Sequence, residues 1–257
     1  MRILVTFALE NEFAPWRSMR KFRRGFWGRT EIQFTEIGGS DVGVILTGVG
    51  PAHVARRLSE VMRNETDGLS VCICSGLAGA LKPEYGIGQV LAARSVLSEH
   101  AKQLTRGLLE SSRALISFAS DCGATVVDRF YTTARVVTTS EEKLALSEMA
   151  EAVDMESFEV LHGAASTGIP AVAIRAISDV ADEDLPLDLN RVFTGAGAVS
   201  VPRVLGQVTL HPGAVPGLMK LGQQSKRAAE SLAQFLDRYV AMLAERARNL
   251  EVKVAAI

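Results

Sequence analysis

Two polar clusters follow two apolar segments in the second half of the chain. One cluster occupies residues 154–156 and contains Glu156, and the other occupies residues 175–179 and ends at Asp179. Carboxyl groups of this kind can act as general acids or bases and can accept hydrogen bonds from substrate hydroxyls. Enzymes of the α/β class keep such groups at the carboxyl ends of their strands. We therefore expect both clusters to line one active site.

The segments around these clusters predict how they are positioned. Residues 152–154 are typical of a short strand, and the apolar run 171–174 is typical of a buried one. A predicted helix of roughly a dozen residues joins them, which together gives a βαβ unit.

The remaining apolar segments alternate between predicted strands and helices, as in an α/β domain. Thr139, with Glu142 three residues later, forms a capping box for a helix. The helical pattern from 225 to about 250 carries an apolar stripe, Leu232 to Leu243, which we expect to pack on the sheet or on a second subunit. We predict one domain over 1–257, with 186–257 as its helical C-terminal extension. Other strands are predicted at 2–8, 26–37, 42–46, 69–75, 88–97 and 135–138, and other helices at 51–64, 111–121 and 140–150.

Composition excludes several classes of partner. The chain has 257 residues, and 28 Lys and Arg against 29 Asp and Glu give a net charge of −1. No bulk charge therefore attracts nucleic acid or an anionic membrane. Three cysteines are too few for a disulfide framework, and neither they nor the four histidines stand at metal-ligand spacing. No apolar run is long enough for a signal peptide or a membrane span. We expect a cytoplasmic protein that binds a small molecule and no metal.

The two clusters also carry a resemblance to a known family. Met155-Glu156 followed by Arg175-Ala176-Ile177-Ser178-Asp179 resembles the signature of the nucleoside phosphorylase and nucleosidase superfamily, and within it the methylthioadenosine/S-adenosylhomocysteine nucleosidases. The resemblance covers about residues 1–182. It implies a mixed, partly barrel-like central sheet flanked by helices, a nucleoside substrate, a homodimer and no cofactor.

Cleaving the N-glycosidic bond of a purine nucleoside requires a proton at N7 of the base, stabilisation of a cationic sugar and a nucleophile at C1′. The resemblance places Asp179 beside N7 as general acid, and the apolar strand before it predicts the burial that favours a protonated carboxyl. It also implies that Glu156 binds the ribose hydroxyls, that Met155 packs against the sugar and that Ser178 belongs to the site. The alternatives are structural: Asp179 as a helix N-cap and Glu156 as a first-turn residue favoured by the helix dipole.

For the nucleophile, Glu12 matches the position at which the nucleosidases keep a carboxylate to activate water. Phosphorylases of the superfamily build this loop from Gly and Arg, because an ionised carboxylate would repel a phosphate dianion. The resemblance therefore favours hydrolysis. Arg175 is expected to balance the negative charge and to fix Glu12 or its water.

The chain departs from the family pattern in two places. Where the family commonly has a Ser that helps to seat the nucleophile, this chain has Leu77, which follows Gly76 and cannot hydrogen-bond through its side chain. Ser75 cannot simply be assumed to replace it. The base-stacking aromatic residue expected near 136–138 is also missing. Val136 and Val137 could supply an apolar wall and backbone contacts to adenine, whereas Phe130 and Tyr131 are more typical of core residues.

Four segments resemble the hopanoid-associated phosphorylases, a subfamily: Gly48-Val49-Gly50-Pro51, Gly76-Leu77-Ala78-Gly79, Ala152-Val153-Asp154-Met155-Glu156-Ser157 and Pro212-Gly213-x-x-Pro216-Gly217-Leu218. This narrower resemblance implies an enzyme that removes adenine from adenosylhopane. We therefore predict a nucleosidase for a 5′-substituted adenine nucleoside, of the methylthioadenosine/S-adenosylhomocysteine type or adenosylhopane.

Three other functions are alternatives to this prediction. Phosphorolysis by a nucleoside phosphorylase remains an open alternative. A catalytically silent nucleoside-binding module should lack Glu12 or Asp179, and both are present. A Rossmann oxidoreductase would need a third glycine where the pattern Gly48-x-Gly50-x-x-His53 has histidine.

Overall fold

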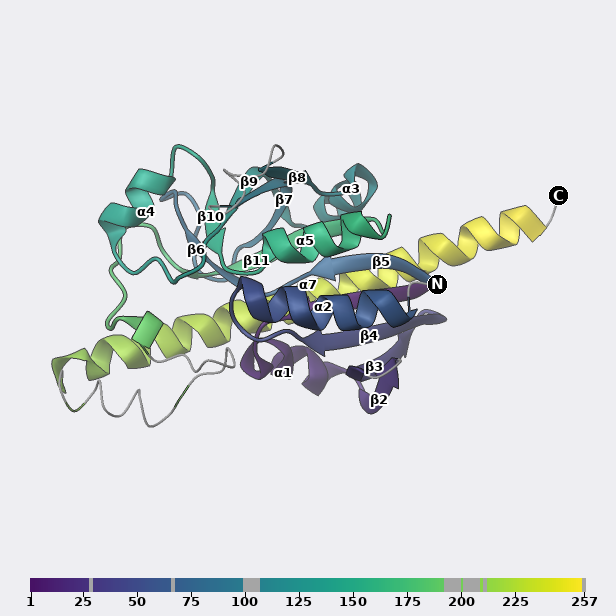
Figure 1. The fold of residues 1–257 in the computed structure, drawn as a ribbon, viewed down its shortest axis with the longest axis horizontal. Helices are drawn as coiled ribbons and strands as arrows, with labels where there is room; N and C mark the ends of the chain where they lie inside the picture. Colours follow the sequence, from purple (N-terminus) through teal and green to yellow (C-terminus); the bar gives the residue numbers. More distant parts are fainter. Residues whose placement is uncertain are drawn as a thin grey trace.

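The structure, a computed structural model, describes residues 1–27, 30–65, 68–98, 107–191, 200, 209 and 212–255. Its elements are arranged as Figure 1 shows. The strands are β1 (Arg2–Phe7), β2 (Arg23–Trp27), β3 (Thr30–Ile37), β4 (Ser40–Leu46), β5 (Leu69–Cys74), β6 (Leu77–Ala80), β7 (Val90–Ser98), β8 (Leu108–Glu110), β9 (Thr125–Thr132), β10 (Ala152–Asp154) and β11 (Ala171–Asp179). The helices are α1 (Glu10–Met19), α2 (Pro51–Glu65), α3 (Arg113–Asp121), α4 (Ser140–Leu146), α5 (Ser157–Ser166) and α7 (Val215–Ala255), with short 3₁₀ turns η2 (Leu189–Arg191) and η3 (Pro212–Ala214).

The described strands form one mixed sheet in the order β2-β3-β4-β1-β5-β11-β6-β10-β9-β7-β8. Strand β1 lies between β4 and β5 and runs parallel to both, and β5 runs parallel to β11. The β2–β3 hairpin adds an antiparallel edge beside β4.

Strand β11 is shared between the open part of the sheet and a closed barrel. It pairs with β5 through Ala171–Ala173, with β7 through Ala173–Ala176 and with β6 from Ala176 to Asp179. Because β6 continues through β10 and β9 back to β7, the strands β11, β6, β10, β9 and β7 close into a ring. This confirms the expected mixed, partly barrel-like sheet flanked by helices.

Alternation along the strands produces two cores on the two faces of the sheet. In β1, Leu4 packs in the core that α2 and α5 cover, whereas Ile3 and Val5 pack in the core that α1, α3 and α7 cover. Strand β5 repeats this pattern, with Cys72 and Cys74 in the first core, where both are fully buried small apolar residues.

Helix α7 runs along the longest axis of the molecule (Figure 1). Its apolar stripe, Leu232, Phe235, Leu236, Tyr239, Val240 and Leu243, is at most 4% exposed in this single chain. Asp237, on the same helix, accepts hydrogen bonds from Trp16 of α1 and from Arg20, the residue after α1. The stripe therefore packs on the chain's own sheet and is not available to a second subunit.

Two strand predictions were wrong. Residues 26–37 were expected as one strand, but they belong to two antiparallel strands, since Trp27 of β2 pairs with Thr30 of β3. Residues 28 and 29 lie outside the described part. Residues 135–138 form a loop, because Val136 N–H and C=O bond the side chain of Asn190 instead of a neighbouring strand. Three further strands were not predicted: β6, which occupies the glycine-containing segment 77–80, β8 and β9.

The predicted parallel βαβ unit was wrong as well. Strands β10 and β11 are not neighbours, since β6 lies between them, parallel to β11 and antiparallel to β10. The two polar clusters still meet, because Arg175, in the middle of β11, bonds Asp154 at the end of β10.

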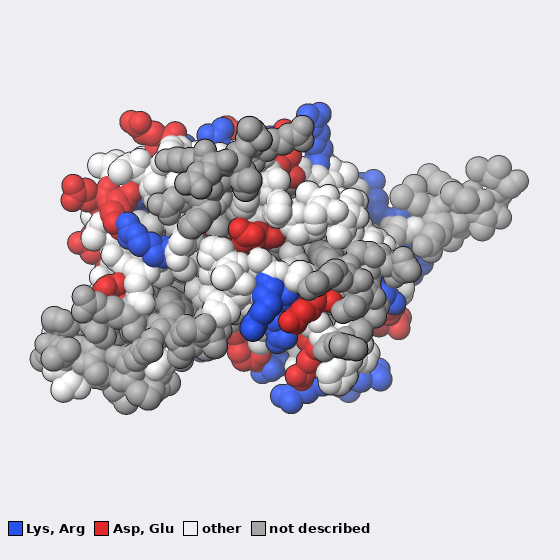
Figure 2. Space-filling view, viewed as in Figure 1, with Lys and Arg blue, Asp and Glu red and all other residues white. Residues whose placement is uncertain are grey.

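The surface shows no separation of charge on the face drawn in Figure 2, where acidic and basic side chains are interspersed. Within the ranges described above, no helix combines the length and apolarity needed to cross a membrane.

We expect Leu236→Ala to destabilise the protein by about 2–5 kcal/mol, since it opens a cavity where α7 packs on the sheet. The matched control is Leu144→Ala, at a side chain that is 70% exposed, with an expected change within about 0.5 kcal/mol. Urea unfolding followed by circular dichroism measures both. Similar values for the two variants would contradict the packing described for α7.

Candidate active site

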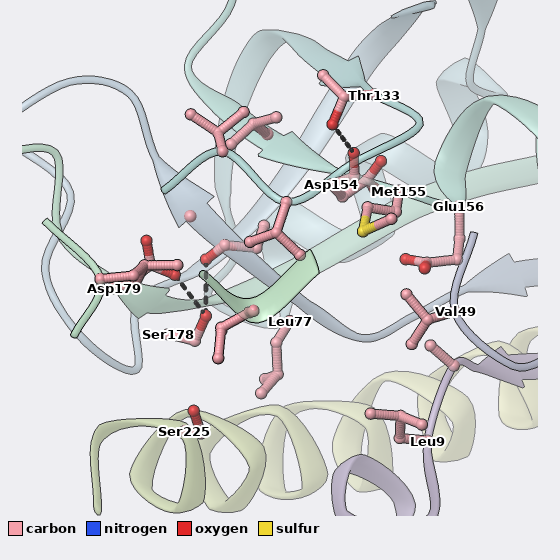
Figure 3. Close-up of a pocket in the computed structure, with 18 of the residues that line it drawn as sticks. Leu9, Val49, Leu77, Thr133, Asp154, Met155, Glu156, Ser178, Asp179 and Ser225 are labelled. Carbon is pink, nitrogen blue, oxygen red and sulfur yellow. Dashed lines mark hydrogen bonds between the residues drawn. The ribbon is translucent and has the colours of Figure 1, made fainter. Parts of the chain in front are cut away.

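One pocket collects most of the predicted site residues (Figure 3). It lies beside the ends of β1, β6, β10 and β11, and its volume of about 790 Å³, which includes its open mouth, suits a small molecule. Of the residues predicted from the sequence, those that line it are Glu12, Leu77, Val136, Val137, Met155, Glu156, Ser178 and Asp179. Arg175 is buried beneath this lining, next to Gly76.

Glu12 stands in the first turn of α1 and is only 8% exposed. Its Oε2 accepts hydrogen bonds from the backbone N–H groups of Ala8 and Leu9, at 2.9 and 3.1 Å. Its Oε1 accepts one from Leu77 N–H at 3.4 Å. Burial raises the pKa of Glu12, and the charge of Arg175 and these three N–H groups oppose that rise. Leu77 therefore contributes to the site through its backbone, although its side chain cannot hydrogen-bond.

Arg175 is the buried cation of the site, at 1% exposure. Its Nε donates to Asp154 Oδ2 at 2.7 Å, and its Nη2 donates to Ser157 Oγ at 3.1 Å and Cys74 Sγ at 3.4 Å. We expected Arg175 to fix Glu12 or its water, but these bonds direct it toward β10 and α5, and it acts on Glu12 as a nearby charge. A Cβ on Gly76 would clash with Nη1 of this guanidinium, so only glycine leaves room for it.

Asp154 serves as the anchor of Arg175. It is 5% exposed and also accepts hydrogen bonds from Thr132 Oγ1 at 2.7 Å, from Ser157 N–H at 3.3 Å and from Ser157 Oγ. Its acceptor capacity is thus used within the protein.

Glu156 lies at the N-terminus of α5 and is 7% exposed. Its Oε1 accepts a hydrogen bond from Gly50 N–H at 3.1 Å, and Arg175 Nη2 lies 3.6 Å from its Oε2. Burial raises the pKa of Glu156 to about 8; Arg175 opposes the rise, and the carboxylates of Asp154 and Glu12 add to it. The Glu156 side chain bonds the distant Gly50 and not its own helix. This contact differs from the structural alternative, in which Glu156 only interacts with the dipole of its own helix. Met155, beside it, lines the pocket near Gly50.

Asp179 ends β11 on the side of the pocket opposite Glu156 (Figure 3). Its Oδ1 forms an ion pair with Lys143 Nζ at 2.7 Å, and its Oδ2 lies 3.0 Å from Ser178 Oγ. Asp179 therefore sits at the end of a strand followed by a turn, and not at a helix N-cap. Sequence reasoning missed Lys143, because a lysine in a short polar helix is typical of an exposed residue.

The loop between β9 and α4 forms an apolar wall of the pocket. Val136 and Val137 line it, and the backbone N–H and C=O of Val136 are bonded to the side chain of Asn190. Backbone contact of Val136 or Val137 with adenine stays a prediction. Phe130 and Tyr131 are 0% and 4% exposed and belong to the core, in line with their interpretation as core residues.

The chain is similar to known proteins in sequence and in fold. Residues 2–241 match the phosphorylase superfamily. Among solved structures, a futalosine hydrolase mutant of Helicobacter pylori superposes with a TM-score of 0.70 at 19% identity, covering 93% of this chain and 98% of that one. A methylthioadenosine nucleosidase mutant of Helicobacter pylori with 5′-methylthioadenosine in its active site gives 0.71 at 18% identity, with 93% and 97% covered. The methylthioadenosine/S-adenosylhomocysteine nucleosidase of Neisseria meningitidis with methylthio-immucillin-A gives 0.71 at 20% identity, with 94% and 99% covered. At these identities the likeness shows a shared fold.

We expect the stability of the parent protein to fall as pH rises from about 5 to about 8. In this window the folded protein, with the pKa of Glu156 at about 8 against an ordinary value of 4.5, binds more protons than the unfolded chain. The raised pKa of Glu12 acts in the same direction. Glu156→Gln should flatten this dependence, as followed by urea midpoints across the pH range. Glu36→Gln, at an exposed position, is the matched control and should keep the parental slope. An unchanged slope in Glu156→Gln would refute the burial of a proton at Glu156.

Proposed function

The chain belongs to the phosphorylase superfamily, and from that premise we propose that it is a nucleosidase, which hydrolyses the N-glycosidic bond of a 5′-substituted adenine nucleoside. One observation carries the proposal: a single pocket holds the buried carboxylate Glu12, the sugar-binding candidate Glu156 and, across the pocket, Asp179. These are the groups that water activation, ribose binding and base protonation need.

The proposed reaction uses each group once. Asp179 gives its proton to N7 of adenine, so that the electron pair of the C1′–N9 bond passes to the base. Glu156 accepts hydrogen bonds from the ribose hydroxyls and stabilises the positive charge that develops on the sugar. Glu12 accepts a proton from a water molecule, which attacks C1′. The products are free adenine and the 5′-substituted ribose.

Charge at the sugar end supports water as the acceptor. The carboxyls of Glu12, Asp154 and Glu156 share one buried guanidinium, that of Arg175, so this cation is already compensated within the protein and is not available to hold a phosphate dianion. Phosphorolysis, the alternative, would need positive charge where Glu12 stands. The side chain of Leu77 adds no hydroxyl that could bind phosphate.

The nature of the 5′ group is the finer part of the proposal. Apolar side chains line the pocket at Leu9, Val49, Leu77 and Leu221, which favours an apolar substituent. Both a methylthio group and the hydrocarbon of adenosylhopane fit this chemistry. A base-release assay with methylthioadenosine, S-adenosylhomocysteine, futalosine and a lipid-tailed adenosine would rank them.

A homodimer remains part of the proposal, on the strength of the family resemblance alone. Its interface must use a surface other than the apolar stripe of α7, since that stripe is buried in the chain's own core. The alternative to an enzyme is a catalytically silent nucleoside-binding module, and release of free base would exclude it.

We expect Asp179→Asn to lower kcat by about 10²- to 10⁴-fold, because an amide cannot supply the proton to N7. The amide oxygen can still accept a hydrogen bond from Lys143, so the fold should persist. Adenine release measures the effect, and Asp182→Asn, an exposed neighbour in the following turn, is the matched control. Activity within a few-fold of the parent would remove Asp179 from the mechanism.

We expect the rate to be independent of phosphate concentration and the product to be free 5′-substituted ribose. Glu12→Gln should lower kcat by about 10²-fold or more, since an amide cannot take a proton from water. Glu10→Gln, in the same helical turn but with a side chain that is 48% exposed, should keep parental activity. A saturable acceleration by phosphate, with ribose 1-phosphate as product, would identify a phosphorylase instead.

A further inference from the structure

Lys143 is a fully buried cation that the proposed mechanism does not use. Its side chain is 0% exposed, although the next residue on α4, Leu144, is 70% exposed. The ammonium forms the ion pair with Asp179 Oδ1 at 2.7 Å and donates to the carbonyl oxygens of Val180 at 2.6 Å and Glu183 at 3.0 Å. A lysine has three N–H donors, so each one has a partner. A charge buried in this way is stable only because these acceptors compensate it.

We propose that Lys143 is a positioning residue for the general acid: it occupies Oδ1 of Asp179, so that the acidic proton resides on Oδ2, and it stabilises the carboxylate left after proton transfer. The proposal rests on the proposed function, in which Asp179 protonates the leaving base.

The placement of the proton follows from the donors around the carboxyl group. An ammonium donates hydrogen bonds and cannot accept them, so a proton on Oδ1 would face Lys143 without an acceptor. Oδ2 lies 3.0 Å from Ser178 Oγ, whose single hydrogen can instead go to the Ala78 carbonyl at 3.2 Å. When Ser178 donates to Ala78, its oxygen is free to accept a hydrogen bond from a protonated Oδ2. The acidic proton is therefore directed to one oxygen.

The charge of Lys143 favours the transfer itself. As the O–H bond of Asp179 breaks and the N7–H bond forms, the C1′–N9 electron pair leaves with the base and Asp179 becomes a carboxylate. That carboxylate is only 14% exposed, so water screens it poorly, and it faces the ammonium at 2.7 Å. A fixed charge that stabilises negative charge as it develops lowers the barrier.

Lys143 also joins the acid to the apolar wall of the pocket. Its two carbonyl partners lie in the segment after β11, which is bonded to the start of α4 and to the loop before it. Ser140 N–H donates to Asp184 Oδ1 at 2.7 Å, and Leu185 N–H donates to the Thr138 carbonyl at 2.8 Å. The acid and the loop that carries Val137 are thus held as one unit.

The test compares two leaving groups in Lys143→Met, which keeps an unbranched side chain of similar length without the charge. One substrate is the adenine nucleoside that the parent cleaves, and the other is 4-nitrophenyl β-D-riboside, whose nitrophenolate departs without a proton. We expect kcat on the adenine nucleoside to fall by about 10- to 100-fold, less than the loss of the acid itself would cause. The rate on the nitrophenyl riboside should stay within about threefold, since that reaction does not use the acid.

Two further variants sharpen the comparison. In an Asp179→Asn background, Lys143→Met should cost no more than about a further twofold, because both changes affect one step. Lys220→Met removes an exposed ion pair to Glu183, in the same turn, and should leave both rates at the parental level.

Equal losses on both substrates, or no loss on the adenine nucleoside, would overturn the proposal. If Lys143→Met does not fold, Lys143→Gln, which retains N–H donors for the two carbonyls but carries no charge, takes its place with the same expected split between substrates. If the parent protein releases no base, both the proposed function and the role of Lys143 are refuted. If the parent releases base but the variants lose the same activity on both substrates, only the role of Lys143 is refuted.

Discussion

The site depends on one buried guanidinium. Arg175 lies in the middle of β11, and its Nε bonds Asp154 at the end of β10, so the ion pair joins two strands that are not neighbours in the sheet. Burial alone would lower the pKa of Arg175, but the surrounding acidic groups, Asp154 first among them, raise it above its ordinary value. The cation thus stays charged, and without it the carboxylates around it would be buried without compensation.

The position of Arg175 follows from the path of β11. The first residues of this strand belong to the open sheet beside β5, and its last residues belong to the barrel beside β6. A strand that changes partners in this way brings its end into the pocket and its middle beneath the pocket lining. Gly76 completes the arrangement, because any side chain there would occupy the space that the guanidinium needs.

The two ends of the pocket differ in charge, and this difference matches the proposed chemistry. At the sugar end, Glu12 and Glu156 are buried carboxyls with raised pKa values, and a positive charge that forms on the sugar beside them would favour their ionised forms. At the base end, Asp179 is paired with the buried ammonium of Lys143, where negative charge would be left after proton transfer. Each end thus stabilises the charge that the reaction would create there.

The sequence by itself determined the features that depend on neighbours along the chain. Apolar runs at 2–8 and 69–75 predicted the buried strands β1 and β5. Thr139 predicted the start of α4, where its side chain accepts a hydrogen bond from Glu142 N–H, and the polar cluster at 154–156 predicted a strand-to-helix junction. These signals are local, since side-chain period and capping need only a few residues.

Tertiary structure alone decided which distant groups meet. The stripe of α7 could have faced a sheet or a subunit, and only the folded chain assigns it to the sheet. Residues 135–138 look like a strand, yet the side chain of a distant asparagine takes the backbone hydrogen bonds of Val136. Lys143 looks like a surface lysine, but pairing across 36 residues of sequence buries it against Asp179. Long-range contacts of this kind leave no periodic trace in the sequence, because the composition of one segment does not record which other segment it will pack against.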